Sequence, residues 1–310
     1  MQLSIIIPVY NRHGLLREAI DSVIRQNLDS CEIIVCDDGS TDDVGKLCDT
    51  YSDANSHVSL SRTPKNYGAQ VARNRGLNLA RGQYVLFLDS DDVLADGGVA
   101  SLLGAMVEDT SLDYVYGKVI RANHQLIPRD ESPPVGEPFT DEPFDLAGYH
   151  WHTMGAMYKR EYLQSVGEWN IEMTGSQDWE YQARVKLAGG KRKFVDSIVG
   201  YWRQHSISRI GTNQFRPDYV RSVMIACDVV LKLAREKNRC DRALENRLAR
   251  RLVVHALEWG VNGHWKDRKL CLLQAKDSVS SNRMMKLGLR VMAYSPMFLD
   301  EFIMDLVNGN

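Results

Sequence analysis

Apolar and polar positions follow two different spacings over residues 1–90. Short unbroken apolar runs are typical of strands buried in a sheet, whereas apolar residues at every third or fourth position indicate amphipathic helices. The strand-like runs are residues 3–11 (the last of which enter a loop), 32–36, 58–61 and 84–88. Helical spacing fills the intervals at residues 15–24, 44–48 and 69–80. Because strands and helices alternate, we predict an α/β fold with a mostly parallel central sheet flanked by helices, and with ligands at the carboxyl ends of the strands.

The pattern changes in the second half of the chain. Strand-like runs recur at residues 150–158 and 193–199, a helix is predicted at 179–187, and the proline-rich interval 120–150 is predicted to be an irregular loop of the kind that often forms a lid. Strand patterns then vanish, and helices are predicted at residues 220–234, 244–259, 269–279 and 284–292, with a final amphipathic turn or two at 297–307 after Pro296. We therefore predict two domains: residues 1–212, and a C-terminal α-helical domain of residues 213–310.

Composition and charge limit the class of protein. The chain is 44% hydrophobic and 25% charged, which is typical of a soluble globular protein. Its net charge of −2 divides into −8 for residues 1–212 and +6 for residues 213–310. The basic residues 213–310 could bind anionic lipid, a polyanionic acceptor or another subunit. The alternative is that they form a solvated helical surface. No run reaches the roughly 18 apolar residues of a spanning helix. Because the sequence starts almost directly with a strand, we expect no signal peptide. The six cysteines form no Cys-x-x-Cys pair, so we expect reduced thiols, no zinc site and a cytoplasmic protein.

The most informative chemistry is the acidic run that directly follows the strand at residues 84–88. Asp89, Asp91 and Asp92 lie within four positions, and Asp37 and Asp38 follow another strand in the same way. Carboxylates this close repel one another unless a cation joins them, and oxygen ligands of this kind suit Mg²⁺ or Mn²⁺. The alternative is a solvated acidic turn that caps the next helix.

Five fragments in order make the chain similar to a known family. They are Ser4-Ile5-Ile6-Ile7-Pro8-Val9-Tyr10-Asn11, Asp37-Asp38-Gly39-Ser40-Thr41-Asp42, Asn66-x-Gly68, Ala72-Arg73-Asn74-x-Gly76 and Phe87-Leu88-Asp89-Ser90-Asp91-Asp92. Over roughly residues 1–210 the sequence resembles glycosyltransferase family 2, whose members are inverting enzymes with the GT-A fold. The resemblance implies a nucleotide-sugar donor and a divalent metal ion, Mn²⁺ or Mg²⁺.

The same resemblance implies roles for individual residues. The metal would be held by Asp91, with Asp89 as a ligand or a contact to the ribose or to a metal-bound water, and with His205 completing the shell. The positions implied for binding the donor are Pro8, Val9, Tyr10, Arg12, Asp38, Arg73, Asp89, Ser90 and Arg203. Asp38 would contact the imide of the nucleobase, which favours uracil or thymine, because a carboxylate accepts a hydrogen bond from a ring N–H. His205 and Arg203 belong to residues 200–208, which we predict to be a loop over the diphosphate. Arg73 has a structural ion pair as its alternative.

A second chemical element is residues 175–180, Gly-Ser-Gln-Asp-Trp-Glu. An inverting transfer needs one base that takes the proton from the acceptor hydroxyl as its oxygen attacks. In the resembled family this base is an Asp in an acidic pair before a helix, which makes Asp178 the candidate. Gln177 replaces the commoner acid, Glu180 is a rival one position off the pattern, and a simple helix-capping role for Asp178 is the alternative.

The leading hypothesis is a metal-dependent inverting hexosyl- or N-acetylhexosaminyl-transferase. It would use a nucleotide sugar, with UDP-sugar favoured, and a glycan or glycolipid acceptor in polysaccharide or cell-surface glycan synthesis. A nucleotidyltransferase and a non-catalytic protein that keeps a degenerate transferase fold are the alternatives. We expect no nucleic-acid partner. The C-terminal helices are expected to contact the inner face of a membrane or a second copy of the chain, or to be plainly solvated.

Overall fold

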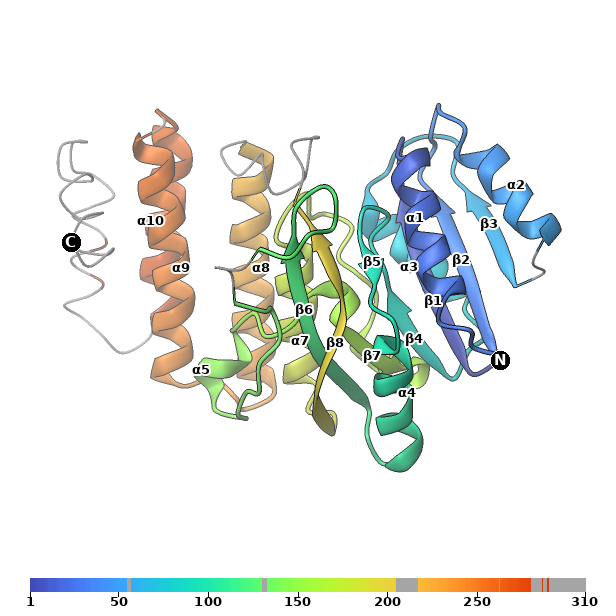
Figure 1. The fold of residues 1–310 in the computed structure, drawn as a ribbon. Coiled ribbons are helices and arrows are strands. Elements are labelled where there is room, and N and C mark those ends of the chain that lie inside the picture. The colour runs from blue at the N-terminus through green and yellow to red at the C-terminus, as the bar shows by residue number, and fades with distance from the viewer. Residues whose placement is uncertain are drawn as a thin grey trace. The chain divides into compact units, whose positions relative to one another are not determined.

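The computed structural model describes residues 1–54, 57–129, 133–204, 217–261 and 263–279, together with Lys286 and Leu289. It divides into two compact units, whose elements are labelled in Figure 1. The first unit comprises Met1–Phe139, Tyr149–Ile171 and Ala188–Ile207. The second comprises Thr140–Gly148, Glu172–Leu187 and Ser208–Asn310, so it contains two segments from before residue 213 as well as the C-terminal helices. A domain boundary between residues 212 and 213 stays a prediction.

The first unit is built on an eight-stranded sheet (Figure 1). Its strands are β1 (Leu3–Val9), β2 (Cys31–Asp37), β3 (Val58–Arg62), β4 (Tyr84–Phe87), β5 (Val93–Leu94), β6 (Tyr114–Ala122), β7 (Ala156–Lys159) and β8 (Arg192–Arg203), in the order β3-β2-β1-β4-β7-β6-β8-β5. β1 pairs in parallel with β2 and β4, as β2 does with β3 and β6 with β8. β7 runs antiparallel to both of its neighbours, β4 and β6, and β5 runs antiparallel to β8. The α/β fold with a mixed, mainly parallel sheet and flanking helices is confirmed.

Helices surround this sheet and make up the second unit. Those of the first unit are α1 (His13–Ile24), α2 (Val44–Ala54), α3 (Ala69–Leu79), α4 (Gly98–Glu108) and α6 (Arg160–Val166), with a 3₁₀ turn, η1, at Thr153–Gly155. Those of the second are α5 (Pro143–Leu146), α7 (Gln177–Leu187), α8 (Pro217–Glu236), α9 (Arg242–Val261) and α10 (Trp265–Ser278). The last three confirm the predicted C-terminal helical region. The helix predicted at 284–292 and the final turns predicted at 297–307 fall outside the described residues, apart from Lys286 and Leu289.

Burial explains why the sequence pattern was informative here. β1 and β2 are buried along their whole length, as expected for central parallel strands, and they therefore appear as continuous apolar runs. α1 buries Leu16, Ala19, Ile20 and Val23 against the sheet, at the spacing of a single helix face.

Three predicted segments differ from the structure. The predicted loop at 120–150 begins within β6, whose earlier residues the sequence analysis did not identify as a strand. The predicted strand at 150–158 is correct only from Ala156 onward, because the buried residues before it form a tight turn closed by a hydrogen bond from the Gly155 N–H to the His152 carbonyl. The predicted loop at 200–208 begins as strand: β8 continues to Arg203, where it still pairs with Ala122 of β6.

All six cysteines are free thiols, and five of them are buried. Burial raises the pKa of Cys36 to about 12. Within the part of the chain that the structure describes, no helix combines the length and the apolar character that crossing a bilayer requires.

A buried carboxylate ties the start of the sheet together. Glu32 of β2 is 3% exposed and accepts hydrogen bonds from the Ser4 hydroxyl (2.7 Å), the Arg81 backbone N–H (2.7 Å) and the Arg81 guanidinium (2.8 and 3.0 Å). Burial alone would raise the pKa of Glu32, but these hydrogen bonds and the Arg81 charge hold it below its ordinary value of 4.5. The folded state therefore gains stability from the charged form of Glu32.

We predict that Glu32→Gln lowers the free energy of unfolding at pH 7 by about 1–3 kcal/mol, because a charged acceptor of several hydrogen bonds is lost. Since the folded pKa is depressed, the contribution is present above pH 4.5 and disappears as the pH falls through the folded pKa. Thermal melts of both proteins from pH 7 to pH 3 should converge at the acid end. A gap in melting temperature that stays constant over this range would contradict the prediction.

Candidate functional site

The acidic turn at Asp89–Asp92 is anchored at both ends by the sheet. Before it, β4 pairs with β1, and the Leu88 N–H donates to the Ile6 carbonyl at 2.9 Å. After it, β5 pairs with β8, and within the turn the Asp92 N–H donates to the Asp89 carbonyl at 3.1 Å. The turn therefore presents its carboxylates at the carboxyl end of β4, where open α/β sheets bind ligands.

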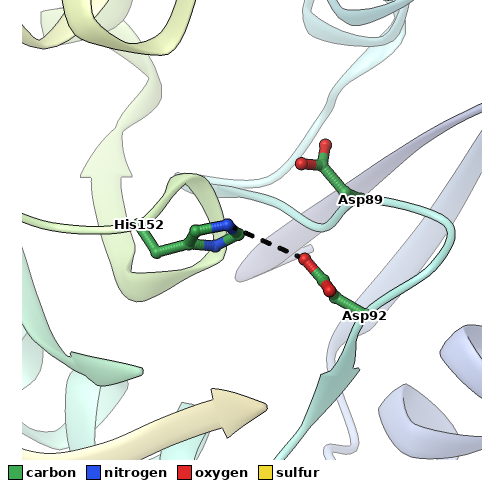
Figure 2. Close-up of side chains that lie close together, drawn as sticks. All are labelled: Asp89, Asp92 and His152. Atoms are coloured by element: carbon green, nitrogen blue, oxygen red, sulfur yellow. Dashed lines mark ion pairs between the residues drawn. The ribbon is translucent and has the colours of Figure 1, made fainter. Parts of the chain in front are cut away.

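Two of these carboxylates meet an imidazole. Asp89, Asp92 and His152 each offer one ligand atom, and these three atoms lie within 4.8 Å of one another. Figure 2 shows the His152 ring reaching toward both carboxylates from the segment before η1. The His152 Nε2 atom lies 3.9 Å from Asp92 Oδ2, and the ring packs against Trp202 of β8 with centroids 4.8 Å apart. Carboxylate and imidazole groups so placed form a donor set that fits a divalent metal ion.

Two arginines compensate the remaining negative charge. The Arg73 guanidinium lies 2.6 Å from Asp89 Oδ1, and the Arg12 guanidinium lies 2.5 Å from Asp91 Oδ2. Burial would raise the pKa of Asp89, but Arg73, His152 and Arg12 together hold it below its ordinary value. Asp89 is therefore ionised at neutral pH, as a metal ligand must be.

Arg73 itself is held by an aromatic ring. Its guanidinium carbon lies 4.5 Å from the centroid of the Trp169 ring, which also packs edge-on against Phe87 of β4. The neighbouring Asn74 fixes Trp169 through two buried hydrogen bonds: its amide donates to the Trp169 carbonyl (2.9 Å), and its oxygen accepts from the Trp169 N–H (2.7 Å). The Arg73–Asp89 pair thus has a rigid support.

Arg203 contacts the other side of the turn. Its backbone N–H donates to Asp92 Oδ1 (2.8 Å) and its Nε to the Asp91 carbonyl (2.9 Å). Its two terminal nitrogens donate to the His124 carbonyl and the Glu18 carboxylate, both at 2.6 Å. With 4% of the residue exposed, Arg203 connects β8, α1 and the acidic turn.

The loops after β1 and β2 are linked to each other. The Asn11 side chain accepts from the Thr41 N–H at 2.7 Å, and the Asn11 N–H donates to the Ser40 hydroxyl at 2.9 Å. Asp38 is buried and accepts from the backbone N–H groups of Tyr67 (3.0 Å to each oxygen) and Gly68 (2.6 Å).

Gly39 permits this close approach. Its φ is +76°, and a Cβ atom there would lie 2.6 Å from the Lys65 backbone. The loop that contains Asp38 therefore packs directly against the segment before α3.

The candidate base lies in the second unit. α7 begins at Gln177, which places Asp178 inside its first turn rather than at the cap, and Asp178 Oδ1 accepts from the Trp179 N–H at 2.9 Å. The rival Glu180 is 1% exposed, and its carboxylate is paired with Arg184 at 2.6 Å. Gln177 donates to the Met173 carbonyl at 3.0 Å. Asp178 is the more accessible of the two acids.

The structure brings most of the predicted donor and metal residues to one place. Arg12, Arg73 and Arg203 contact the acidic turn, which contains Asp89, the buried Ser90 and Asp91. Val9 is buried in β1, as Pro8 is, and Tyr10 after it is 42% exposed. Of the predicted metal ligands, Asp89 belongs to the three-residue cluster, Asp91 pairs with Arg12, and His205 lies outside the described residues.

Sequence reasoning missed His152 as a member of this cluster and gave Asp92 a lesser role. The spacing of His150 and His152 was a usable signal, but the acids that His152 meets, Asp89 and Asp92, are distant in sequence. Trp151, which stands between these two histidines, is fully buried, and its indole N–H donates to the Tyr158 hydroxyl at 2.9 Å.

Comparison with known proteins gives a family and a fold. The family described as Glycosyl transferase family 2 matches residues 4–167. Glycosyltransferase GlyG of Streptococcus pneumoniae is 32% identical over 115 residues, covering 37% of this chain and 38% of that protein. An uncharacterized glycosyltransferase, YibD of Escherichia coli, is 35% identical over 166 residues, covering 51% and 45%. The chain thus spans less than half the length of these curated relatives.

Solved structures share the fold over almost the whole chain. Staphylococcus aureus TarS 1–349, in complex with UDP-GlcNAc, superposes with a TM-score of 0.72 at 18% identity, covering 100% of this chain and 93% of that one. The mannosyltransferase PcManGT from Pyrobaculum calidifontis, in complex with GDP-Man and Mn²⁺, gives a TM-score of 0.56 at 16% identity, covering 98% and 85%.

We predict that Asn74→Ala lowers the free energy of unfolding by about 1–3 kcal/mol, because both backbone polar groups of Trp169 lose a buried partner. The matched control is Asn78→Ala, one turn later on α3, where the side chain is exposed and its bond to Glu168 is 3.3 Å. That change should stay within about 0.5 kcal/mol. Urea unfolding followed by tryptophan fluorescence measures both, and equal losses would contradict the prediction.

Proposed function

The chain belongs to glycosyl transferase family 2 and has the GT-A fold, and on that premise we propose that it transfers a sugar from a nucleotide-sugar donor to a hydroxyl group of a carbohydrate or lipid-linked glycan. The observation that carries the proposal is the cluster of Asp89, Asp92 and His152 at the carboxyl end of β4, with Asp91 and its arginine partner beside it. Relatives named as glycosyltransferases support the reaction class. We propose polysaccharide or cell-surface glycan synthesis as the setting.

A metal ion fits the acidic cluster. Asp89, Asp92 and His152 would hold it, with Asp91 as a further carboxylate, and Mn²⁺ or Mg²⁺ is the proposed ion because oxygen ligands predominate. PcManGT, which shares the fold, binds Mn²⁺. When bound, such an ion neutralises the charge that builds up on the departing diphosphate.

The donor is proposed to be a UDP-sugar. Asp38 accepts hydrogen bonds from three donors, the Tyr67 and Gly68 N–H groups and the Thr63 hydroxyl, and a uracil N–H would share or replace one of these contacts. The exposed Tyr10 ring is placed after β1 to stack on a base. TarS binds UDP-GlcNAc, whereas PcManGT binds GDP-Man, so the fold alone does not select the nucleotide.

The arginines divide into two groups by their surroundings. Arg12 and Arg73 each pair with one carboxylate of the turn, and both are proposed to contact donor phosphates. All three guanidinium nitrogens of Arg203 donate to protein oxygens. We therefore propose that Arg203 holds the turn in place, and not that it pairs with the diphosphate as the sequence analysis expected.

Transfer would proceed by a single displacement with inversion. The acceptor oxygen attacks the anomeric carbon, the bond from that carbon to the diphosphate oxygen breaks, and its electron pair leaves with the diphosphate. Asp178 takes the proton of the attacking hydroxyl. Glu180 is less suited to this role because it is buried against Arg184.

We predict that UDP with Mn²⁺ raises the melting temperature by several degrees and that UDP or Mn²⁺ alone has a smaller effect, because a ligand that binds the folded state stabilises it by mass action. GDP, CMP and dTDP provide the comparison. Asp92→Asn and His152→Gln should remove the metal-dependent part. Asp96→Asn is the control, since Asp96 follows the turn but its side chain is 88% exposed. No shift with any nucleotide would favour the non-catalytic alternative.

We predict that Asp178→Asn keeps this thermal shift but lowers UDP release from UDP-glucose or UDP-GlcNAc by about 100-fold or more, the usual range for a general base. Water serves as the acceptor in this assay. Glu180→Gln is the discriminating variant, and a larger loss there would reassign the base. Proton NMR should detect the β-anomer of the released sugar first, and early release of the α-anomer would contradict inversion.

A further inference from the structure

The segment that leads into Asp178 has an unusual backbone. Ser176 is not glycine, yet its φ is +53°, a left-handed conformation that few residues with a side chain adopt. The Glu180 N–H donates to the Ser176 carbonyl at 3.1 Å, so α7 starts directly from this residue. Such a conformation persists only where surrounding contacts hold it.

Those contacts come from α8. Ser222 is 1% exposed, and its hydroxyl oxygen accepts from the Thr174 N–H (2.8 Å) and the Gly175 N–H (3.3 Å) while donating to the Asp218 carbonyl (3.0 Å). The Tyr219 ring lies so close to Gly175 that a Cβ atom there would be 2.2 Å from it. The backbone just before Ser176 is thus held by one hydroxyl and one ring.

A side chain of α9 contacts both sides of Asp178. The Arg251 Nη2 atom donates to the Ser176 hydroxyl at 3.3 Å, and the guanidinium carbon lies 4.1 Å from the centroid of the Trp179 ring. The Trp179 indole N–H in turn donates to the Ala147 carbonyl at 2.8 Å. The residues that flank Asp178 are therefore fixed by the C-terminal helices.

We propose that Ser222 and Arg251 are positioning residues: they hold residues 174–179 in the conformation that presents the Asp178 carboxylate. This inference rests on the proposed function, in which Asp178 is the base. It assigns the C-terminal helices α8 and α9 a part in the reaction. A misplacement of a reacting group by about 1 Å can cost about 100-fold in rate.

The test measures kcat and donor KM for UDP release from UDP-glucose and UDP-GlcNAc with Mn²⁺. Ser222→Ala and Arg251→Met should each lower kcat by about tenfold to 100-fold. The donor KM should stay within about twofold of its original value, because the residues proposed to bind the donor belong to the first unit. Two controls match them. Ser278→Ala removes a buried hydroxyl that donates to the Gln274 carbonyl of its own helix, α10, and Arg250→Met removes an exposed cation from α9. Neither control should change kcat.

A double-mutant cycle separates positioning from general destabilisation. Asp178→Glu already displaces the carboxylate, so adding Ser222→Ala to it should lower kcat much less than tenfold further. Three outcomes would overturn this inference and leave the proposed function standing. They are fully additive losses in kcat, an unchanged kcat in both single variants, and an effect confined to KM. No UDP release by the unsubstituted protein would overturn the proposed function, and the inference with it.

Discussion

Repulsion among the carboxylates of Asp89, Asp91 and Asp92 is the constraint on which the rest of the site depends. Two unit charges about 4 Å apart interact by about 4 kcal/mol at an effective dielectric constant of about 20, so three acids in four consecutive residues need compensation. The protein supplies it from residues distant in sequence: Arg12 to Asp91, Arg73 to Asp89, and the backbone N–H of Arg203 to Asp92. Because these contacts hold the three acids close together, the turn is a candidate site for a cation.

Sheet topology decides which residues can reach this turn. β4 lies between β1 and β7, and since β1 is parallel to β4, the loop after β1 brings Arg12 to the carboxyl end of β4. β7 is antiparallel to β4, so the residues before β7 arrive at the same edge, and these include His152. β8 runs in the direction of β4 again, through its pairing with β6, and therefore delivers Arg203 there at its end. The site is a consequence of strand direction as much as of residue type.

The same reasoning explains what could be predicted from the sequence. The buried strands β1, β2 and β4, the acids that follow β2 and β4, and Arg73 could all be predicted, because each depends on a local pattern of apolar or charged residues. His152 was not, since its contact with Asp92 depends on the direction of β7, and a single sequence does not reveal whether a short strand pairs in parallel or antiparallel. Residues 200–203, which are basic and aromatic, have the composition of a loop but form the end of a strand. That strand is defined by its pairing with β6 and not by an alternating apolar face, so a local pattern does not reveal it.

The composition of the chain also does not reveal which earlier segments belong to the same compact unit as the C-terminal helices. The strand pattern vanishes near residue 217, which suggested a separate appendage, yet residues 140–148 and 172–187 belong to the same compact unit as those helices. Buried polar contacts account for this: Lys186 of α7 is 2% exposed and donates to the Gly148 carbonyl, and Ser222 of α8 accepts from the backbone before α7. The local conformation around Asp178 is consequently set by helical packing, whereas the conformation of the acidic turn is set by the sheet. A substitution in the sheet and one in α8 should therefore separately disturb the proposed donor site and the proposed base, which is the physical reason for measuring donor binding and the rate of transfer separately.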